Sequence, residues 1–177
     1  MKRFFLCLFL IQSASASDGD FIDYFSRFHT LFSAAKMSPQ EYSSIITYPV
    51  NPDHFLDFDG EMPWEYPPES NQSGFVINHP GVIFNGDMAR TFFLRYLQET
   101  ILHDGTLNVG NKKIYKKKGI EFSFYIREIE QNNVVLHENI LAPANDGEDN
   151  YGEHACSYSF SRTESGDITL SDITCAG

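Results

Sequence analysis

The chain has 177 residues and a formal net charge of -11, and 15% of its residues are aromatic. This length suits one compact domain, and the abundance of aromatic side chains supplies a core. An acidic surface disfavours nucleic acids and anionic membranes and favours a cationic partner, with charge that serves solubility alone as the alternative interpretation.

The first 16 residues predict a cleaved secretory signal peptide. Lys2 and Arg3 form a positive segment, residues 4–11 are apolar, and Ala14-Ser15-Ala16 is a small-residue cleavage signature. The apolar run is too short for a membrane span, which requires about 20 such residues. We therefore expect residues 17–177 to form one exported domain, periplasmic or secreted, with a net charge of -13 once Lys2 and Arg3 are removed.

An amphipathic helix is predicted over about Asp20–Lys36, because aromatic residues recur there at helical spacing. These residues are Phe21, Phe25, Phe28 and Phe32. Ser38, Pro39 and Glu41 then form the pattern of a capping box, which predicts a short second helix to about Ile45. Residues 45–50 are rich in β-forming types, and the proline-rich residues 51–73 are expected to form a long loop or arm.

Residues 73–84 are predicted to form one or two short strands, interrupted at His79-Pro80-Gly81. A third helix is predicted to begin with Asn85 as its cap and to end near Leu102. Its apolar stripe consists of Ala89, Phe93, Leu97 and Ile101. The lysine-rich segment at residues 111–118 is expected to be a strand edge protected by charge rather than a nucleic-acid site.

Two antiparallel hairpins are predicted in the last third of the chain. The first turns about Asn132-Asn133, two residues that tolerate the left-handed conformation of a tight turn. The second turns about a two-residue loop at Ser165-Gly166, and this register sets Cys156 directly opposite Cys175. Cross-strand neighbours lie close enough for a disulfide, which is also what a pair of cysteines in an exported chain indicates. The remaining cysteine, Cys7, lacks the small residues before it that a lipid anchor would require.

Helices first and strands last predict the α+β class, with the N-terminal helices packed on the concave face of a strongly curved, mainly antiparallel sheet. Two segments, "FSRFHTLFSAAKMSPQEYSSIITYPV" and "VIFNGDMARTFFLRYL", are similar to the paired first helices and to the strand, glycine and third helix of one superfamily. In these segments and in its element order, residues 17–177 resemble the nuclear-transport-factor-2-like superfamily, also called SnoaL-like or cystatin-like cones. This superfamily of cone-shaped α+β barrels holds enzymes, carriers, secretion-system components and toxin-immunity proteins, so the resemblance implies a fold rather than a function.

One candidate site follows from the first hairpin, where the predicted register sets Glu128 opposite His137. Inside a cone this pair would be an acid–base couple, whereas the nearby turn favours a charge pair on a solvated face. The resemblance to isomerases implies an aspartate base and tyrosine donors in the cavity, but no aspartate precedes Asp172 in the predicted strands. The tyrosines expected to face inward are Tyr48, Tyr96 and Tyr125.

Acidic segments at residues 53–61 and 145–154 contain oxygen ligands that suit calcium, but neither has the spacing of a calcium loop. A site at the cysteines would have His154 as its only further ligand, so we assign no metal and no cofactor. In the arm, aromatic and acidic residues are candidates for partner binding, with folding over the barrel mouth as the alternative for the aromatic ones. These candidates are Trp64, Tyr66, Asp57, Asp59 and Glu61.

No nucleophile motif of the G-x-S-x-G type is present, and we assign no catalytic residue. The sequence therefore favours an exported, non-enzymatic binding protein with a cationic protein partner, in its most specific form an immunity protein or inhibitor of a cationic toxin or cell-wall hydrolase. A small-molecule carrier or isomerase-like enzyme that uses the cone cavity is the first alternative. A structural component of an envelope assembly, homodimeric through the face of its sheet, is the second.

Overall fold

The computed structural model describes residues 16–34, 38–47, 55–59, 64–65, 73–143 and 151–177. Its helices are α1 (Ala16–Ser33), α2 (Pro39–Ser43), α3 (Ser73–Asn78) and α4 (Asp87–Leu97), with a 3₁₀ turn η2 (Val82–Phe84) before α4 and a π-helical turn η3 (Gln98–Leu102) after it. The strands are β1 (Leu56–Asp57), β2 (Trp64–Glu65), β3 (Lys113–Lys117), β4 (Ile120–Glu130), β5 (Asn133–Pro143), β6 (Tyr151–Arg162) and β7 (Ile168–Ala176).

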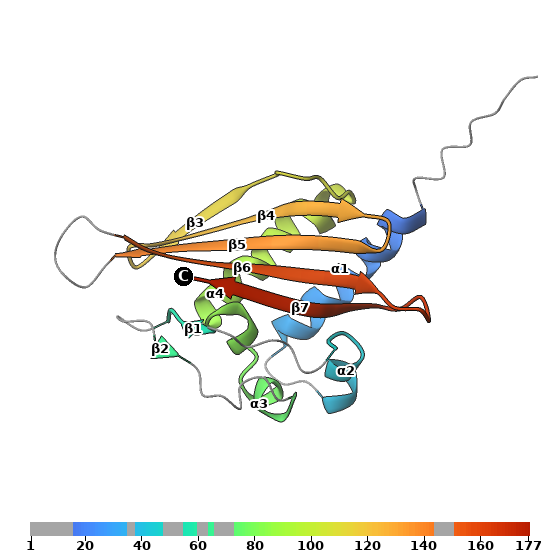
Figure 1. Cartoon of the computed structure of the whole chain (residues 1–177), viewed down its shortest axis with the longest axis horizontal. Coiled ribbons are helices and arrows are strands. Elements are labelled where there is room, and N and C mark those ends of the chain that lie inside the picture. Colours follow the sequence, from blue (N-terminus) through green and yellow to red (C-terminus); the bar gives the residue numbers. More distant parts are fainter. Residues whose placement is uncertain (1–15, 35–37, 48–54, 60–63, 66–72, 144–150) are drawn as a thin grey trace, which may run out of the picture.

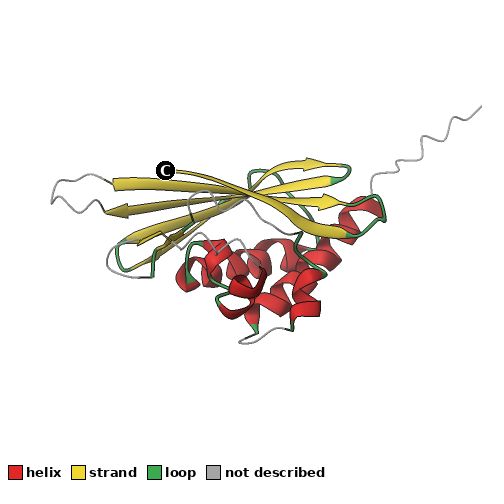
Figure 2. Ribbon diagram, turned by 60° about the horizontal axis from the view of Figure 1, so that its bottom comes forward, coloured by secondary structure: helices red, strands yellow, loops and turns green. Residues whose placement is uncertain are grey.

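The protein has two layers, with the helices on one face of an antiparallel sheet (Figure 1). The sheet has the order β3-β4-β5-β6-β7, so each strand pairs with its neighbours in sequence, and β1 and β2 form a separate pair. The α+β class with early helices and late strands is confirmed. The strong curvature is not, because the sheet is open and twisted (Figure 2), and in its strand order β3 and β7 are edges that do not pair with each other. Ordinary strand twist lets five strands cover the helical layer without closing a cone.

Aromatic rings fill the space between the two layers. The predicted stripe of α1 is confirmed, since Phe21, Phe25, Phe28 and Phe32 are all buried. Phe28 lies at the centre of this core: its ring centroid is 6.0 Å from that of Phe84, 6.1 Å from Phe93 and 5.6 Å from Phe160. Such spacings are typical of stabilising aromatic contacts. The helix, the η2–α4 segment and the sheet are therefore held together by one aromatic cluster.

The capping box before α2 is confirmed. Glu41 N–H donates to the Ser38 hydroxyl at 3.2 Å, and Ser38 N–H donates to the Glu41 carboxylate at 3.0 Å. The predicted strands over residues 73–84 are wrong, because this segment forms α3 and η2 instead. Val82, Ile83 and Phe84 are all buried. A short apolar run that is buried on every side has no periodicity to separate a strand from a helical turn.

Asn85 is not the cap of the third helix, contrary to the prediction. It ends η2 in the left-handed conformation, with φ of 58°, and the N-cap of α4 is Gly86. The side chain of Asp59 takes over the capping: its two oxygens accept from the N–H groups of Asp87 and Met88 at 2.7 and 2.6 Å. The cap therefore comes from the arm, 28 residues earlier in the chain.

The hairpin of β4 and β5 is confirmed, but its predicted register is wrong. Glu130 pairs with Asn133, so the turn consists of residues 131 and 132. This turn sets Glu128 opposite Val135, and a bulge at Arg127 then shifts the pairing beyond it, so that Ile126 lies opposite Leu136. A bulge inserts one unpaired residue into a strand and displaces every pair beyond it.

The hairpin of β6 and β7 sets Cys156 opposite Cys175, and the two form a disulfide, as predicted. The predicted two-residue loop is wrong: strand pairing ends at Arg162 and Ile168, which leaves a five-residue loop. An extra residue on β7, Ser171, forms a bulge that restores the predicted register at the cysteines. Two deviations of one residue thus cancel along this hairpin.

Candidate functional site

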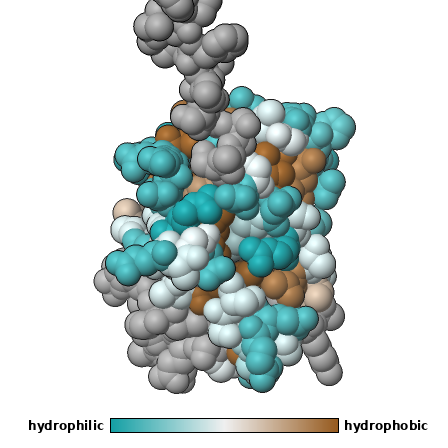
Figure 3. Space-filling view, turned by 90° about the vertical axis from the view of Figure 1, so that its right-hand side faces the viewer, coloured by the Kyte–Doolittle hydropathy of each residue, from teal (hydrophilic) through white to brown (hydrophobic). Residues whose placement is uncertain are grey.

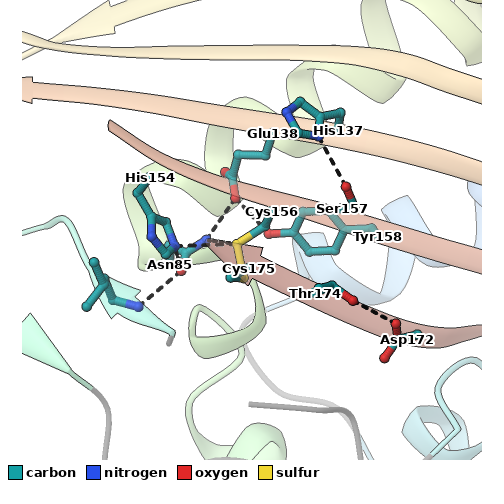
Figure 4. Close-up of a disulfide and its surroundings, with 11 residues drawn as sticks. Asn85, His137, Glu138, His154, Cys156, Ser157, Tyr158, Asp172, Thr174 and Cys175 are labelled. Atoms are coloured by element: carbon teal, nitrogen blue, oxygen red, sulfur yellow. Dashed lines mark hydrogen bonds between the residues drawn. A yellow bond between two sulfur atoms is a disulfide. The ribbon is translucent and has the colours of Figure 1, made fainter. Parts of the chain in front are cut away.

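A buried polar cluster lies where the arm, the start of α4 and the sheet meet (Figure 4). We call it the Asn85 cluster. Its members are Asn85, Glu138, His154, Tyr158 and the disulfide Cys156–Cys175.

Strand alternation carries Glu138 into the core. On β5 the residues that face the helices are buried, and Glu138 falls between Leu136 and Ile140 in that series. Its side chain is 0% exposed. A fully buried carboxyl group is rare in a protein core, because ionisation there is costly unless hydrogen bonds compensate for the lost water.

Two donors converge on one oxygen of this carboxyl group. The Tyr158 hydroxyl donates to Glu138 Oε2 at 2.7 Å, and Asn85 Nδ2 donates to the same atom at 2.8 Å. Glu138 Oε1 is buried and has no hydrogen-bond partner among the described residues. Burial raises the pKa of Glu138 to about 7, against the opposing effect of the two donors. Burial, and then the nearby carboxylate, also raises the pKa of Tyr158.

Asn85 connects the arm to the sheet. Its Oδ1 accepts from Leu56 N–H at 3.1 Å and lies 3.2 Å from His154 Nε2, while its backbone oxygen accepts from Phe58 N–H at 3.1 Å. Its Nδ2 also contacts Cys156 Sγ at 3.3 Å. One asparagine held in a left-handed conformation therefore links β1, β5 and β6.

Three residues of metal-ligating types meet at this point, since the ligand atoms of His154, Cys156 and Cys175 all lie within 4.8 Å of one another. The two sulfur atoms are joined in the disulfide, so neither is the thiolate that a zinc ion binds. His154 Nε2 lies 3.4 Å from Cys156 Sγ, and its ring packs on Phe58 with a centroid distance of 5.6 Å. In the oxidised protein these residues pack as part of the core.

The predicted acid–base couple does not form. Glu128 is exposed and faces Val135, whereas His137 lies opposite Tyr125, with 5.1 Å between the ring centroids. His137 Nδ1 lies 3.2 Å from Ser157 Oγ (Figure 4), and burial lowers the pKa of the imidazole. These side chains lie on the face of the sheet that the helices leave uncovered, away from the Asn85 cluster.

The three candidate tyrosines do not gather at one site. Tyr96 is buried in α4, and burial raises its pKa to about 12. Tyr125 is half-buried on the uncovered face of the sheet. Tyr48 lies outside the described residues. The tyrosine that does meet a carboxyl group in the core is Tyr158.

Of the partner-binding candidates in the arm, the two aspartates have structural contacts. Asp57 Oδ1 accepts from Asp59 N–H at 2.8 Å, and Asp59 caps α4. Trp64 lies in β2, opposite Asp57, while Tyr66 and Glu61 lie outside the described residues. From the second acidic segment, Glu153 accepts from Asn139 Nδ2 at 2.9 Å, His154 belongs to the Asn85 cluster, and residues 145–150 lie outside the described part of the chain.

A charged groove of about 450 Å³ opens at the end of the molecule where α1 begins and the β6–β7 loop turns. Figure 3 shows this end, on which hydrophilic side chains cover much of the surface. The lining residues are Asp20, Asp23, Arg27, Arg162, Gly166, Asp167 and Ile168. Arg162 is held inside the groove wall, because it pairs with Asp20 at 2.9 Å, donates to the Gly166 oxygen at 3.1 Å and lies over the ring of Phe21.

Comparisons with protein families, characterised proteins and solved structures found no match to this chain. Among the described helices, none is both long and apolar enough to cross a membrane. The disulfide is consistent with an exported protein, because such bonds persist in oxidising compartments.

Sequence reasoning missed Glu138, Tyr158 and Asn85 as one cluster. One signal was present: on β5, Glu138 interrupts an otherwise apolar series at every second residue. The partners were not visible, because Asn85 and Glu138 are 53 residues apart in sequence.

Proposed function

We propose that this protein is an exported, non-enzymatic binding protein that engages a cationic segment of a protein partner. The observation that carries the proposal is the groove at the start of α1. Its rim holds three exposed aspartates, and two of them, Asp23 and Asp167, form no ion pair within the described part of the protein. Exposed carboxylates that lack an ion-pair partner in a concave surface are suited to lysine or arginine side chains.

The charge of the whole chain supports the same partner class. A net charge of -11 attracts a cationic molecule from beyond contact distance and repels other acidic proteins. This attraction decays over about 10 Å at 0.1 M salt, so binding of this kind is sensitive to ionic strength. Among the described residues, the aromatic rings around Phe28 fill the space between the helices and the sheet. This packing favours binding at the surface over binding inside the protein.

We further propose that the chain is a member of the nuclear-transport-factor-2-like superfamily. Paired N-terminal helices, a helix that follows Gly86 and long antiparallel strands at the end of the chain support this relationship. The open sheet and the helical α3 segment depart from the cone pattern. With the cleaved signal peptide expected at residues 1–16, the superfamily's immunity members favour an envelope toxin or cell-wall hydrolase as the cationic partner.

A labelled lysine-rich peptide of eight residues tests the groove directly. We expect it to bind in 50 mM salt and to weaken at least tenfold in 300 mM salt. The variant Asp23→Lys/Asp167→Lys should lose this binding. The control Glu121→Lys/Glu153→Lys makes the same change of charge on strand ends far from the groove, and it should bind within about threefold of the wild type because the groove carboxylates remain. Equal losses in both variants would mean that net charge acts without the groove, and no binding at low salt would refute the proposal.

One observation favours a second candidate, a carrier or enzyme for a small molecule. Glu138 Oε1 is buried without a hydrogen-bond partner among the described residues, and the adjacent Tyr158 hydroxyl completes a pair that can share a proton. A ligand with one hydroxyl or amide donor would satisfy this oxygen. Thermal unfolding with a panel of small alcohols and amides tests it: a ligand that stabilises the wild type and not Glu138→Leu would support this candidate, and a panel without effect would oppose it.

A further inference from the structure

The two edges of the five-stranded sheet differ in how far other segments of the chain cover them. Beside β7, Leu170 N–H donates to the Ile45 oxygen at 2.8 Å and Thr47 N–H donates to the Leu170 oxygen at 2.9 Å, so the segment after α2 covers this edge. Before the start of β3, Gly110 N–H donates to the Ile126 oxygen at 2.8 Å, so this segment covers the part of β4 that β3 does not reach. Along β3 itself, the described residues provide no such neighbour on the outer side.

The turn before β4 decides which backbone groups of β3 face outward. Lys118 and Gly119 have φ of 53° and 80°, the left-handed pair of a two-residue hairpin turn, and Lys117 pairs with Ile120 across it. Residues that flank such a turn exchange hydrogen bonds, and the pattern alternates along the strand. Lys113, Tyr115 and Lys117 therefore bond to β4. The N–H and C=O groups of Ile114 and Lys116 point away from the sheet.

The side chains along this edge are cationic in an acidic protein. Five lysines fall within residues 112–118. Lys116 pairs with Glu121 at 2.9 Å and Lys118 Nζ donates to the Asp59 oxygen at 3.1 Å. Lys112, Lys113 and Lys117 form no ion pair with the described residues. Between them Ile114 is 51% exposed, which supplies an apolar contact on the uncovered side.

Charge makes this open edge selective. A second copy of β3 placed against the first would set lysine against lysine, which is how proteins prevent edge-to-edge aggregation. The same lysines attract a strand of opposite charge, whose backbone can pair with Ile114 and Lys116. Backbone pairing supplies affinity in such added strands, and the side chains supply selectivity.

We propose that the outer edge of β3 binds an extended acidic segment of a partner protein as a sixth strand of the sheet. This site is independent of the groove and of the proposed function, because it lies on another element and takes the opposite charge. The partner segment needs at least four residues in extended conformation, with carboxylates close to Lys113 and Lys117 and a free backbone edge.

The test uses the oxidised full-length protein and an acetylated, amidated peptide of four Glu-Val repeats, with amide exchange followed by NMR. On binding, the amides of Ile114 and Lys116 should exchange at least tenfold more slowly, whereas those of Lys113, Tyr115 and Lys117 are protected already. The fully N-methylated peptide, which cannot donate, should bind at least tenfold more weakly.

Variants separate backbone pairing from charge. Ile114→Pro removes an outward donor without removing a bond to β4, and should weaken binding at least tenfold, while Ile114→Ala should weaken it less than threefold. Lys117→Glu should weaken binding at least fivefold, and the matched reversal Arg127→Glu on β4 should have less than a twofold effect. Unchanged exchange at Ile114 and Lys116, or equal binding of the N-methylated peptide, would show that charge acts alone and would overturn the proposal. An absence of binding at millimolar peptide would overturn it as well.

Discussion

Replacing Glu138 with glutamine should make the protein more stable at neutral and alkaline pH. The wild-type carboxyl group has a pKa of about 7 in the folded protein, against 4.5 for an unperturbed glutamate. An acid whose pKa is raised by folding favours the folded state below its unfolded pKa, and this contribution is lost as the pH rises through the folded pKa. The difference of about 2.5 pKa units corresponds to about 3 kcal/mol of unfolding free energy, lost between about pH 4.5 and pH 7.

Glutamine retains an oxygen that accepts from Tyr158 and Asn85, but it does not ionise. Urea unfolding with the disulfide intact, at pH 4.5, 6, 7 and 8, measures the difference between the two proteins at each pH. We expect Glu138→Gln to gain up to about 3 kcal/mol over the wild type between pH 4.5 and pH 8. The control Glu128→Gln removes an exposed carboxylate and should follow the wild type within about 0.5 kcal/mol. If the unfolding free energies of Glu138→Gln and the wild type changed with pH in parallel, the burial of an ionisable group at this position would be refuted.

Three further predictions concern the elements that hold the fold. The variant Cys156→Ala/Cys175→Ala should lose about 3 kcal/mol in urea unfolding, because the 19-residue separation is no longer closed in the unfolded chain, and an unchanged midpoint would contradict this. Asp59→Ala should lose about 1 kcal/mol by the same assay, since it removes the acceptor for two N–H groups of α4, and Asp59→Asn should recover at least half of it. Phe28→Ala should lose about 3–5 kcal/mol and Phe28→Leu less than half as much, and a thermal scan that shows no loss for alanine would contradict the central position of this ring.

Local chemistry made several elements predictable. The aromatic spacing of α1 and the capping box at Ser38 are short-range patterns that require no knowledge of the rest of the fold. The disulfide was predictable because two cysteines at matched distances from a turn can oppose each other. The lysine-rich strand was also confirmed, as the edge strand β3.

The predictions that were wrong concerned features that depend on packing between distant segments. The bulges at Arg127 and Ser171 changed strand register without a glycine or proline to signal them. Residues 73–84 became helical because buried turns and buried strands share the same apolar composition. The role of Asp59 as a cap and of Asn85 as a link between arm and sheet arises from contacts across 28 residues or more, which no local pattern contains.

The measurement that tests the proposed function most directly is a capture experiment from the native cell-envelope extract. Three immobilised proteins spanning residues 17–177 are compared at 50 mM and 300 mM salt by mass spectrometry: the wild type, Asp23→Lys/Asp167→Lys and Glu121→Lys/Glu153→Lys. We predict that the wild type and the second variant retain the same basic protein at low salt, and that the groove variant does not. Retention of that protein by all three, or by none, would contradict the assignment of the groove as the site for a cationic partner.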